Sequence, residues 1–247
     1  MNSIDPILPI FLLLLAAGVS VPAQEETPRP YANPERFEEN IKRFEASDQN
    51  GFPPTGAIVC IGSSSMGGWH ATLREDLAPL TVIPRGFGGS NMNDALHFAD
   101  RIVIPYQPRA IVLYEGDNDI AGGIPPEQIR DTFSAFVKRV REKLPEVRIY
   151  VLSIKPSPNR WKLWPLMKIA NQRLEAYCSN DDRLFYVDVA TPMLDADGEP
   201  RPELYKEDRL HMTPAGYEVW RNVLRPILIE NELRFEPRPA DAVKPVP

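Results

Sequence analysis

The stretch AIVCIGSSSMGGWH spans residues 57–70 and joins two kinds of local structure. Residues 57–62 form a short apolar run, rich in β-branched side chains, which predicts a strand buried on both faces. The run stops at Gly62, a residue type that suits a tight turn. Three serines follow, and serine is a preferred cap at the start of a helix. The stretch therefore predicts the strand–turn–helix unit of an α/β fold.

The same alternation of strand and helix patterns continues along the chain. Further apolar runs predict strands at 81–84, 110–116, 147–154 and 184–189. Amphipathic or apolar patterns predict helices at 90–102, 126–144, 161–178 and 214–229. This order favours a three-layer α/β/α domain with a five-stranded, mostly parallel sheet. Sheets of this kind bind ligands beyond the carboxyl ends of their strands, so the loops at those ends are the place to look for chemistry.

The composition limits the domain count and the classes of partner. The chain has 247 residues, a net charge of −6 and 25% charged residues, which suits one globular domain. The acidic balance and the lack of a Lys/Arg cluster argue against a nucleic-acid partner. We expect the domain at 56–230, after a linker and short amphipathic helix at 24–55, and a disordered tail at 231–247.

The first residues carry an export pattern. An apolar core at 7–19 is followed by small residues, with Val21 and Ala23 suited to cleavage after Ala23. We therefore expect residues 1–23 to be a secretory signal peptide, the protein to be periplasmic or secreted, and the mature chain to have no membrane span. Asp5 stands where a positive charge is usual, so an uncleaved anchor is the alternative.

The serines at 63–65 are the first chemically capable residues after a strand. A nucleophilic serine needs an exposed position on a tight turn, a base within hydrogen-bond distance and donors for an oxyanion. Gly62 supplies the turn, and a helix beginning there would aim free backbone N–H groups at the same point. The G-x-S-x-G motif is missed, because Met66 occupies its last position. Taken alone, the serines favour a helix cap.

A possible base lies near the end of the expected domain, in DRLH at 208–211. The spacing lets the carboxylate of Asp208 accept a hydrogen bond from Nδ1 of His211, which leaves Nε2 free to act as a base. A surface ion pair is the commoner cause of such spacing. The pattern gains weight only together with other motifs.

Four motifs occur in order over 56–230: IGSSSMGGW, RGFGGSN, EGDND and DRLH. Together they resemble the SGNH hydrolases, which include the GDSL-type esterases and lipases. The resemblance implies that Ser64 is the nucleophile, His211 the base and Asp208 its orienter. It also implies an oxyanion hole built from the N–H groups of Ser64 and Gly89 and the side-chain amide of Asn118.

One residue departs from the founding motif of that family. GSSS at 62–65 stands where the founding motif is Gly-Asp-Ser-Leu, as in a bacterial branch, so Ser63 replaces an aspartate. That aspartate is not the triad acid, and the change affects local packing and strand-end bonding more than catalysis. The resemblance implies a cofactor-free serine ester hydrolase that works through an acyl-enzyme.

The expected substrate is a small-molecule ester that carries a short acyl or acetyl group, either an acylated carbohydrate or a small lipid. Two alternatives from other classes stay open. One is a non-catalytic carbohydrate-binding protein that keeps the fold. The other is an acyltransferase that passes the acyl group of the same acyl-enzyme to a sugar hydroxyl instead of water.

Other acidic motifs favour structural roles over metal binding. Asp117 and Asp119 flank Asn118, but carboxylates on a strand-end turn usually accept backbone N–H groups. DADG at 195–198 begins like a calcium loop, although Lys206 takes the place of the glutamate at its twelfth position. We therefore expect no metal site.

The remaining candidates are also interpreted as structural. Cys60 lies inside an apolar strand, so no disulfide with Cys178 is expected. Trp161 and Trp164 favour the core over a substrate groove, because their spacing suits one face of a helix. Two histidines lie in predicted helices without a partner at a useful spacing: His70 and His97.

Overall fold

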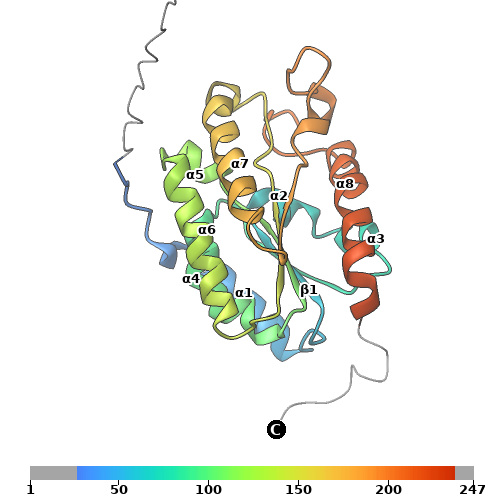
Figure 1. The fold of residues 1–247 in the computed structure, drawn as a ribbon. Coiled ribbons are helices and arrows are strands. Elements are labelled where there is room, and N and C mark those ends of the chain that lie inside the picture. The colour runs from blue at the N-terminus through green and yellow to red at the C-terminus, as the bar shows by residue number, and fades with distance from the viewer. Residues whose placement is uncertain (1–26, 237–247) are drawn as a thin grey trace, which may run out of the picture.

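Five short strands pair in parallel in the order β2-β1-β3-β4-β5 and form the centre of the molecule (Figure 1). The computed structural model describes residues 27–236. The strands are β1 (Ile58–Gly62), β2 (Val82–Gly86), β3 (Ala110–Tyr114), β4 (Arg148–Leu152) and β5 (Leu184–Val187). This confirms the expected α/β fold, and the sheet is parallel throughout. Three strands, β3, β4 and β5, end two residues earlier than expected, because the chain there turns out of the sheet.

Apolar side chains on both faces of the sheet explain the three layers. Val59 and Ile61 of β1 enter one core cluster, whereas Ile58 and Cys60 enter the other, and all four are fully buried. A strand buried on both faces needs no polar alternation.

Helices cover the two faces in separate groups (Figure 1). The first face is covered by α1 (Glu38–Gln49), α4 (Met92–Ile102), α6 (Pro126–Arg141) and α7 (Trp164–Cys178). The second is covered by α2 (Ser64–Trp69), α3 (Leu73–Asp76) and α8 (Pro214–Glu232). The short helix α5 (Asp117–Ala121) follows β3, and single 3₁₀ turns lie at Pro34–Phe37, Ile104–Tyr106, Trp161–Leu163, Thr191–Met193, Pro202–Leu204 and Leu233–Phe235.

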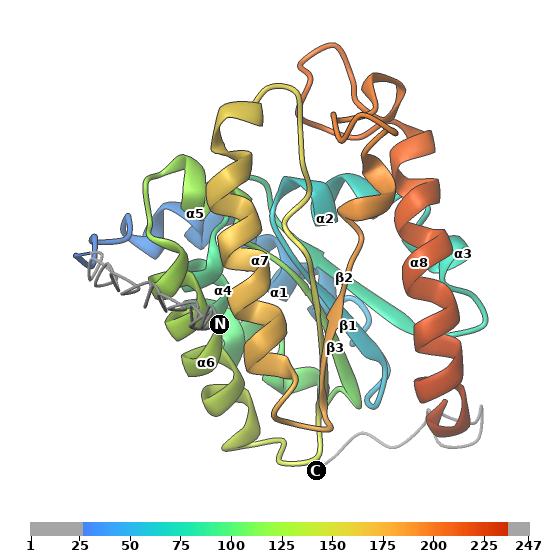
Figure 2. The same cartoon turned by 45° about the horizontal axis from the view of Figure 1, so that its top comes forward.

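The register of the sheet brings three strand ends level with one another. Gly62 pairs with Gly86 of β2 and with Tyr114 of β3. A Cβ atom at Gly62 would lie 2.2 Å from the carbonyl oxygen of Tyr114, and one at Gly86 would lie 2.3 Å from the backbone nitrogen of Gly67. Only glycine fits such approaches, so α2 begins directly against the end of the sheet. Figure 2 shows α2, α5 and the segment between β5 and α8 at this end.

The ends of the described chain belong to the domain. The expected amphipathic helix is present as α1, where Ile41 is fully buried, and Arg101 of α4 forms ion pairs with Glu38 and Glu45. A disordered tail from residue 231 was wrong for its first residues, since α8 continues to Glu232. The fully buried carboxylate of Glu232 receives hydrogen bonds from Arg148 and from the hydroxyl of Tyr150.

Two expectations concern the two ends of the chain. The signal peptide at 1–23 and the rest of the tail, 237–247, lie outside the described residues. Within 27–236, no helix combines the length and the apolar character that a membrane crossing requires.

Candidate active site

Ser64 is the first residue of α2 and lies directly after the carboxyl end of β1. The turn is fixed through its backbone: the N–H of Ser63 donates to the carbonyl of Tyr114 at 3.1 Å, and Gly67 donates to the carbonyl of Ser63 at 2.9 Å. Ser63 itself is buried, which agrees with a packing role for the residue that departs from the family motif. Ser64 is half-buried, so its hydroxyl stays accessible.

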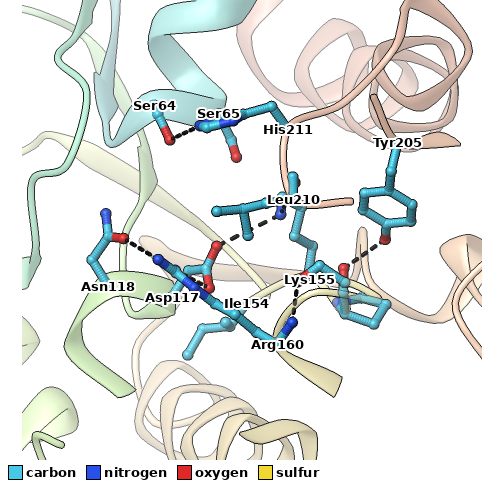
Figure 3. Close-up of polar contacts among 12 residues, drawn as sticks. Ser64, Ser65, Asp117, Asn118, Ile154, Lys155, Arg160, Tyr205, Leu210 and His211 are labelled. Carbon is cyan, nitrogen blue, oxygen red and sulfur yellow. Dashed lines mark hydrogen bonds and ion pairs between the residues drawn. The ribbon is translucent and has the colours of Figure 1, made fainter. Parts of the chain in front are cut away.

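The structure brings His211 to this serine from the far end of the chain (Figure 3). Asp208 lies on the other side of the same imidazole. The Nε2 atom of His211 lies 3.0 Å from Oγ of Ser64, and its Nδ1 atom lies 2.6 Å from Oδ2 of Asp208. Both side chains remain partly exposed, at 39% and 48% of their surface. These distances are compatible with the roles expected for the three residues, which are a nucleophile, a base and the group that orients the base.

A tight loop sets the geometry of His211. The other oxygen of Asp208 accepts hydrogen bonds from the backbone N–H groups of Leu210 and His211, both at 2.9 Å. The bond from the His211 side chain and these two backbone bonds hold the pKa of the Asp208 carboxyl well below its usual range. Arg209 adopts a φ of +59° to complete the loop, and Thr213 then caps α8. Asp208 therefore stays ionised beside the imidazole.

The glycine loop after β2 lies against Ser64. The N–H of Phe87 donates to the carbonyl of Gly62 at 2.8 Å, and a Cβ atom at Gly88 would lie 3.7 Å from Cβ of Ser64. Gly89 has a φ of +86°, a conformation that glycine adopts without strain. The loop therefore lies close to the serine at Gly88, and the role expected for the N–H group of Gly89 stays a prediction.

Asn118 reaches the same region from α5. Its amide nitrogen donates to the carbonyl of Ser90 at 2.8 Å, and its amide oxygen accepts from Nη2 of Arg160 at 3.0 Å. An amide nitrogen carries two protons, so one remains for a ligand. In Figure 3 the nitrogen points away from Arg160. The carboxamide is therefore held in one orientation from both ends.

Buried carboxyl groups support these loops. The hydroxyl of Ser90 donates to Glu115 at 2.6 Å, and burial raises the pKa of the Glu115 carboxyl well above its usual range. Asp119 accepts hydrogen bonds from the backbone of Met92 at 3.1 Å and of Gly116 at 3.0 Å, and burial raises its pKa to about 7. Asp119 thus has the backbone-binding role that its position predicted. Among residues 27–236, no group of three or more His, Cys, Asp and Glu side chains could hold a metal ion.

Sequence reasoning missed two cations beneath the site, Lys155 and Arg160. Lys155 is fully buried after β4 and donates to the carbonyl of Leu210, while Arg160 binds Asp117 at 2.6 Å. A signal for Lys155 was present, because a lysine in VLSIKP directly follows an apolar strand at the edge where ligands bind.

The other candidates occupy structural positions. Cys60 and Cys178 are separate thiols in the two opposite core clusters. His70 accepts a hydrogen bond from the N–H of Gly86 at 2.9 Å, and Trp164 belongs to the core. Trp161 stacks on Trp164 with ring centroids 5.9 Å apart and lines a cavity of about 170 Å³. The exposed His97 lies 3.3 Å from Glu35.

The sequence aligns with those of known proteins over almost its whole length. Platelet-activating factor acetylhydrolase IB subunit alpha1 of Homo sapiens is 24% identical over 241 residues, which cover 94% of this chain and 100% of the human protein. The Bos taurus protein of the same name is 25% identical over 223 residues, which cover 86% and 91%.

Solved structures share the fold. A GDSL-like lipase of Bacteroides thetaiotaomicron superposes with a TM-score of 0.68 at 20% identity, over 77% of this chain and 98% of that one. An acetyl-xylooligosaccharide esterase of Geobacillus superposes with a TM-score of 0.57 at 14% identity, over 70% and 93%. The model of the GDSL-like lipase/acylhydrolase family matches residues 50–219, well over half of the sequence. The chain therefore belongs to the GDSL-like lipase/acylhydrolase family, whose members hydrolyse esters.

Proposed function

We propose that the protein is a serine ester hydrolase that removes short acyl groups through a Ser64–His211–Asp208 triad. The observation that carries this proposal is the continuous contact from Oγ of Ser64 through both ring nitrogens of His211 to Asp208. A serine is a weak nucleophile at neutral pH, and a base in contact with its hydroxyl activates it. Membership of an ester-hydrolysing family supports the same chemistry.

The reaction has two halves. Oγ of Ser64 attacks the ester carbonyl carbon while Nε2 of His211 takes the hydroxyl proton, and the carbonyl oxygen becomes an oxyanion. The oxyanion then collapses, the carbon–oxygen bond to the alcohol breaks, and His211 gives its proton to the leaving alkoxide. Water repeats the sequence on the acyl-enzyme and releases the acid. Asp208 holds the imidazole in the required tautomer throughout.

Three donors are available to the oxyanion in this proposal: the N–H groups of Ser64 and Gly89 and the free amide proton of Asn118. The first residue of a helix has a backbone N–H without a partner inside the helix, and Ser64 is such a residue. The fixed carboxamide of Asn118 adds a donor that needs no reorganisation during the reaction.

The relatives support a short acyl group. The human relative is named an acetylhydrolase and the Geobacillus neighbour an acetyl-xylooligosaccharide esterase, so both names refer to acetyl esters. We infer that the substrate is an acetylated small molecule, with a carbohydrate or a small lipid as the alcohol part.

The test is hydrolysis of p-nitrophenyl esters with acyl chains of two to twelve carbons, followed by acetylated glycans and an acetylated lipid. We expect the highest kcat/KM with the acetyl ester, and loss of the activity in Ser64→Ala. Equal rates for the two proteins would overturn the proposal and leave the binding protein as the alternative. Adding sugar acceptors and measuring the acylated sugar separates a hydrolase from an acyltransferase, because a transferase would divert most acyl groups from water.

We also propose that the protein is exported, on the pattern of residues 7–23 alone. Expression of the full chain should give a mature protein that begins at Gln24 outside the cytoplasm. The double variant Leu13→Arg/Leu14→Arg should stay in the cytoplasm, because it interrupts the apolar core. A membrane-bound product that retains residues 1–23 would support the uncleaved anchor.

A further inference from the structure

A chain of charged contacts runs beneath the site and connects the loop of the base with the amide of Asn118 (Figure 3). Nζ of Lys155 lies 2.9 Å from the carbonyl oxygen of Leu210 and 3.6 Å from Oδ2 of Asp117. The other oxygen of Asp117 accepts from Nη1 of Arg160 at 2.6 Å, and Nη2 of Arg160 donates to the amide oxygen of Asn118 at 3.0 Å.

We propose that Lys155 and Arg160 are positioning residues that act through Asp117 as one unit and fix the imidazole relative to the oxyanion donor. This inference rests on the proposed function, because it assigns one end of this series of contacts to the triad and the other end to the oxyanion hole. Neither cation is placed at the reacting atoms, so both act through other groups.

The contact of Lys155 explains how it reaches the base. The carbonyl that it holds belongs to the peptide bond between Leu210 and His211, and the N–H of that same peptide donates to Asp208 at 2.9 Å. A cation at one end of a peptide group polarises it and strengthens its N–H as a donor. Lys155 therefore fixes the peptide that carries the imidazole, and with it the bond to Asp208.

The contact of Arg160 explains how the chain reaches the oxyanion hole. An amide held only through its nitrogen could turn over and present its oxygen to the negative charge. The guanidinium prevents this, since it carries donors only and must face the amide oxygen of Asn118. The remaining proton of the amide nitrogen then stays directed away from Arg160.

Because these charged groups are buried, the loss of one partner would leave the other without compensation and cost free energy. Lys155 has no exposed side-chain surface, and Asp117 and Arg160 expose 7% and 18%. Burial lowers the pKa of the Lys155 ammonium, whereas the carboxylate of Asp117 opposes that shift. The ring of Tyr205, whose centroid is 5.6 Å from Nζ, closes the other side. A buried ion pair adds little net stability, and a role in orienting two loops gives a reason for its presence.

The test is a double-mutant cycle on the hydrolysis of p-nitrophenyl acetate, with the variants Lys155→Met, Arg160→Met and Asn118→Ala. Each methionine keeps an apolar stem and removes the charge. We expect each methionine variant to lower kcat by about 10–100-fold with KM within about threefold, because misplacement of reacting groups by about 1 Å costs up to about 10²-fold. The rate of Ser64 labelling by a fluorophosphonate should fall in parallel.

The cycle separates positioning from general stability. In the Asn118→Ala background, Arg160→Met should cause a smaller further loss than in the wild type, since its direct route through the amide is removed and only the route through Asp117 is left. Lys155→Met should keep the part of its effect that acts on His211. Losses that multiply for Arg160→Met and Asn118→Ala would overturn the inference, as would unchanged kcat in both methionine variants. If Lys155→Met fails to fold, the comparison of Arg160→Met, Asn118→Ala and their double variant tests the inference.

A matched control comes from the opposite end of β4. Glu232→Gln disturbs another buried charged cluster, with Arg148 and Tyr150, far along the same strand. It should lower thermal stability and leave kcat unchanged.

The experiment distinguishes failure of the inference from failure of the proposed function. A wild-type protein as inactive as Ser64→Ala overturns the proposed function. An active wild type with equally active methionine variants overturns only the positioning role.

Discussion

Asp208 holds His211 at two places, because one carboxylate oxygen accepts from the imidazole and the other from the backbone N–H of the same histidine. This double contact fixes both the ring orientation and the position of the loop. An asparagine could still accept from the backbone, but its amide nitrogen would face Nδ1 and favour the wrong tautomer.

Asp208→Asn should therefore lower kcat by about 10⁴-fold while the protein stays folded. Steady-state hydrolysis of p-nitrophenyl acetate measures the loss, and circular dichroism checks the fold. Asp195→Asn is the control, since Asp195 also accepts from turn N–H groups but is exposed on another loop. A fall of less than tenfold for Asp208→Asn would mean that the proposed triad does not carry the reaction.

Asn118→Ala removes one proposed oxyanion donor and should lower kcat by about 10²–10³-fold with little change in KM. Asn118→Asp should lose more, because a second negative charge would lie close to the oxyanion. Asn180→Ala serves as the control, since that amide is exposed and binds only a local carbonyl. If KM rises while kcat is unchanged, Asn118 binds substrate in its ground state instead.

Gly86→Ala tests the contact between β2 and α2 on which the position of Ser64 depends. The new methyl group would lie 2.3 Å from the backbone nitrogen of Gly67, so the strand end and the helix start must separate. We expect a loss of about 1–3 kcal/mol in the free energy of unfolding, the usual range for overpacking, together with lower activity. Gly51→Ala, which meets nothing within 4 Å, should stay within about 0.5 kcal/mol of wild type in urea unfolding. Equal stability of the two variants would contradict this packing argument.

The sheet and the proximity of the proposed triad residues could both be predicted from the sequence. Strands buried on both faces show as continuous apolar runs, and the ends of parallel strands meet at one edge, so 62–65 and the EGDND motif could be placed together from topology alone. Asp208 and His211 were predictable because their contact is local in the chain. Their meeting with Ser64 required the family resemblance.

The charged chain beneath the site could not be predicted in the same way. Lys155 and Arg160 pair with groups about forty or more residues away in the sequence, and no local pattern says which carboxylate a buried lysine will meet. The end of the domain was misplaced for a similar reason. A glutamate in the last turn of a helix looks exposed in the sequence, whereas Glu232 turns inward to Arg148.

The pH dependence of stability gives a last prediction, centred on His70. Burial, together with the charges of Arg85 and Arg74, lowers the pKa of its imidazole to about 4 from an ordinary value of 6.5. The neutral ring accepts from the N–H of Gly86, and protonation would remove that acceptor. Between pH 6.5 and 4 the unfolded chain binds a proton that the folded chain does not, so this contribution to stability is complete above pH 6.5 and is lost as the pH falls.

The loss should reach at most about 3 kcal/mol, at about 1.4 kcal/mol per pKa unit. Glu115 and Asp119 have raised pKa values and change stability in the opposite sense over the same interval, so the measurement must be a difference. The free energy of unfolding of wild type minus that of His70→Gln, which can still accept from Gly86 but does not titrate, should fall from pH 7 to pH 4. A flat difference for His70→Gln would contradict the lowered pKa of this imidazole.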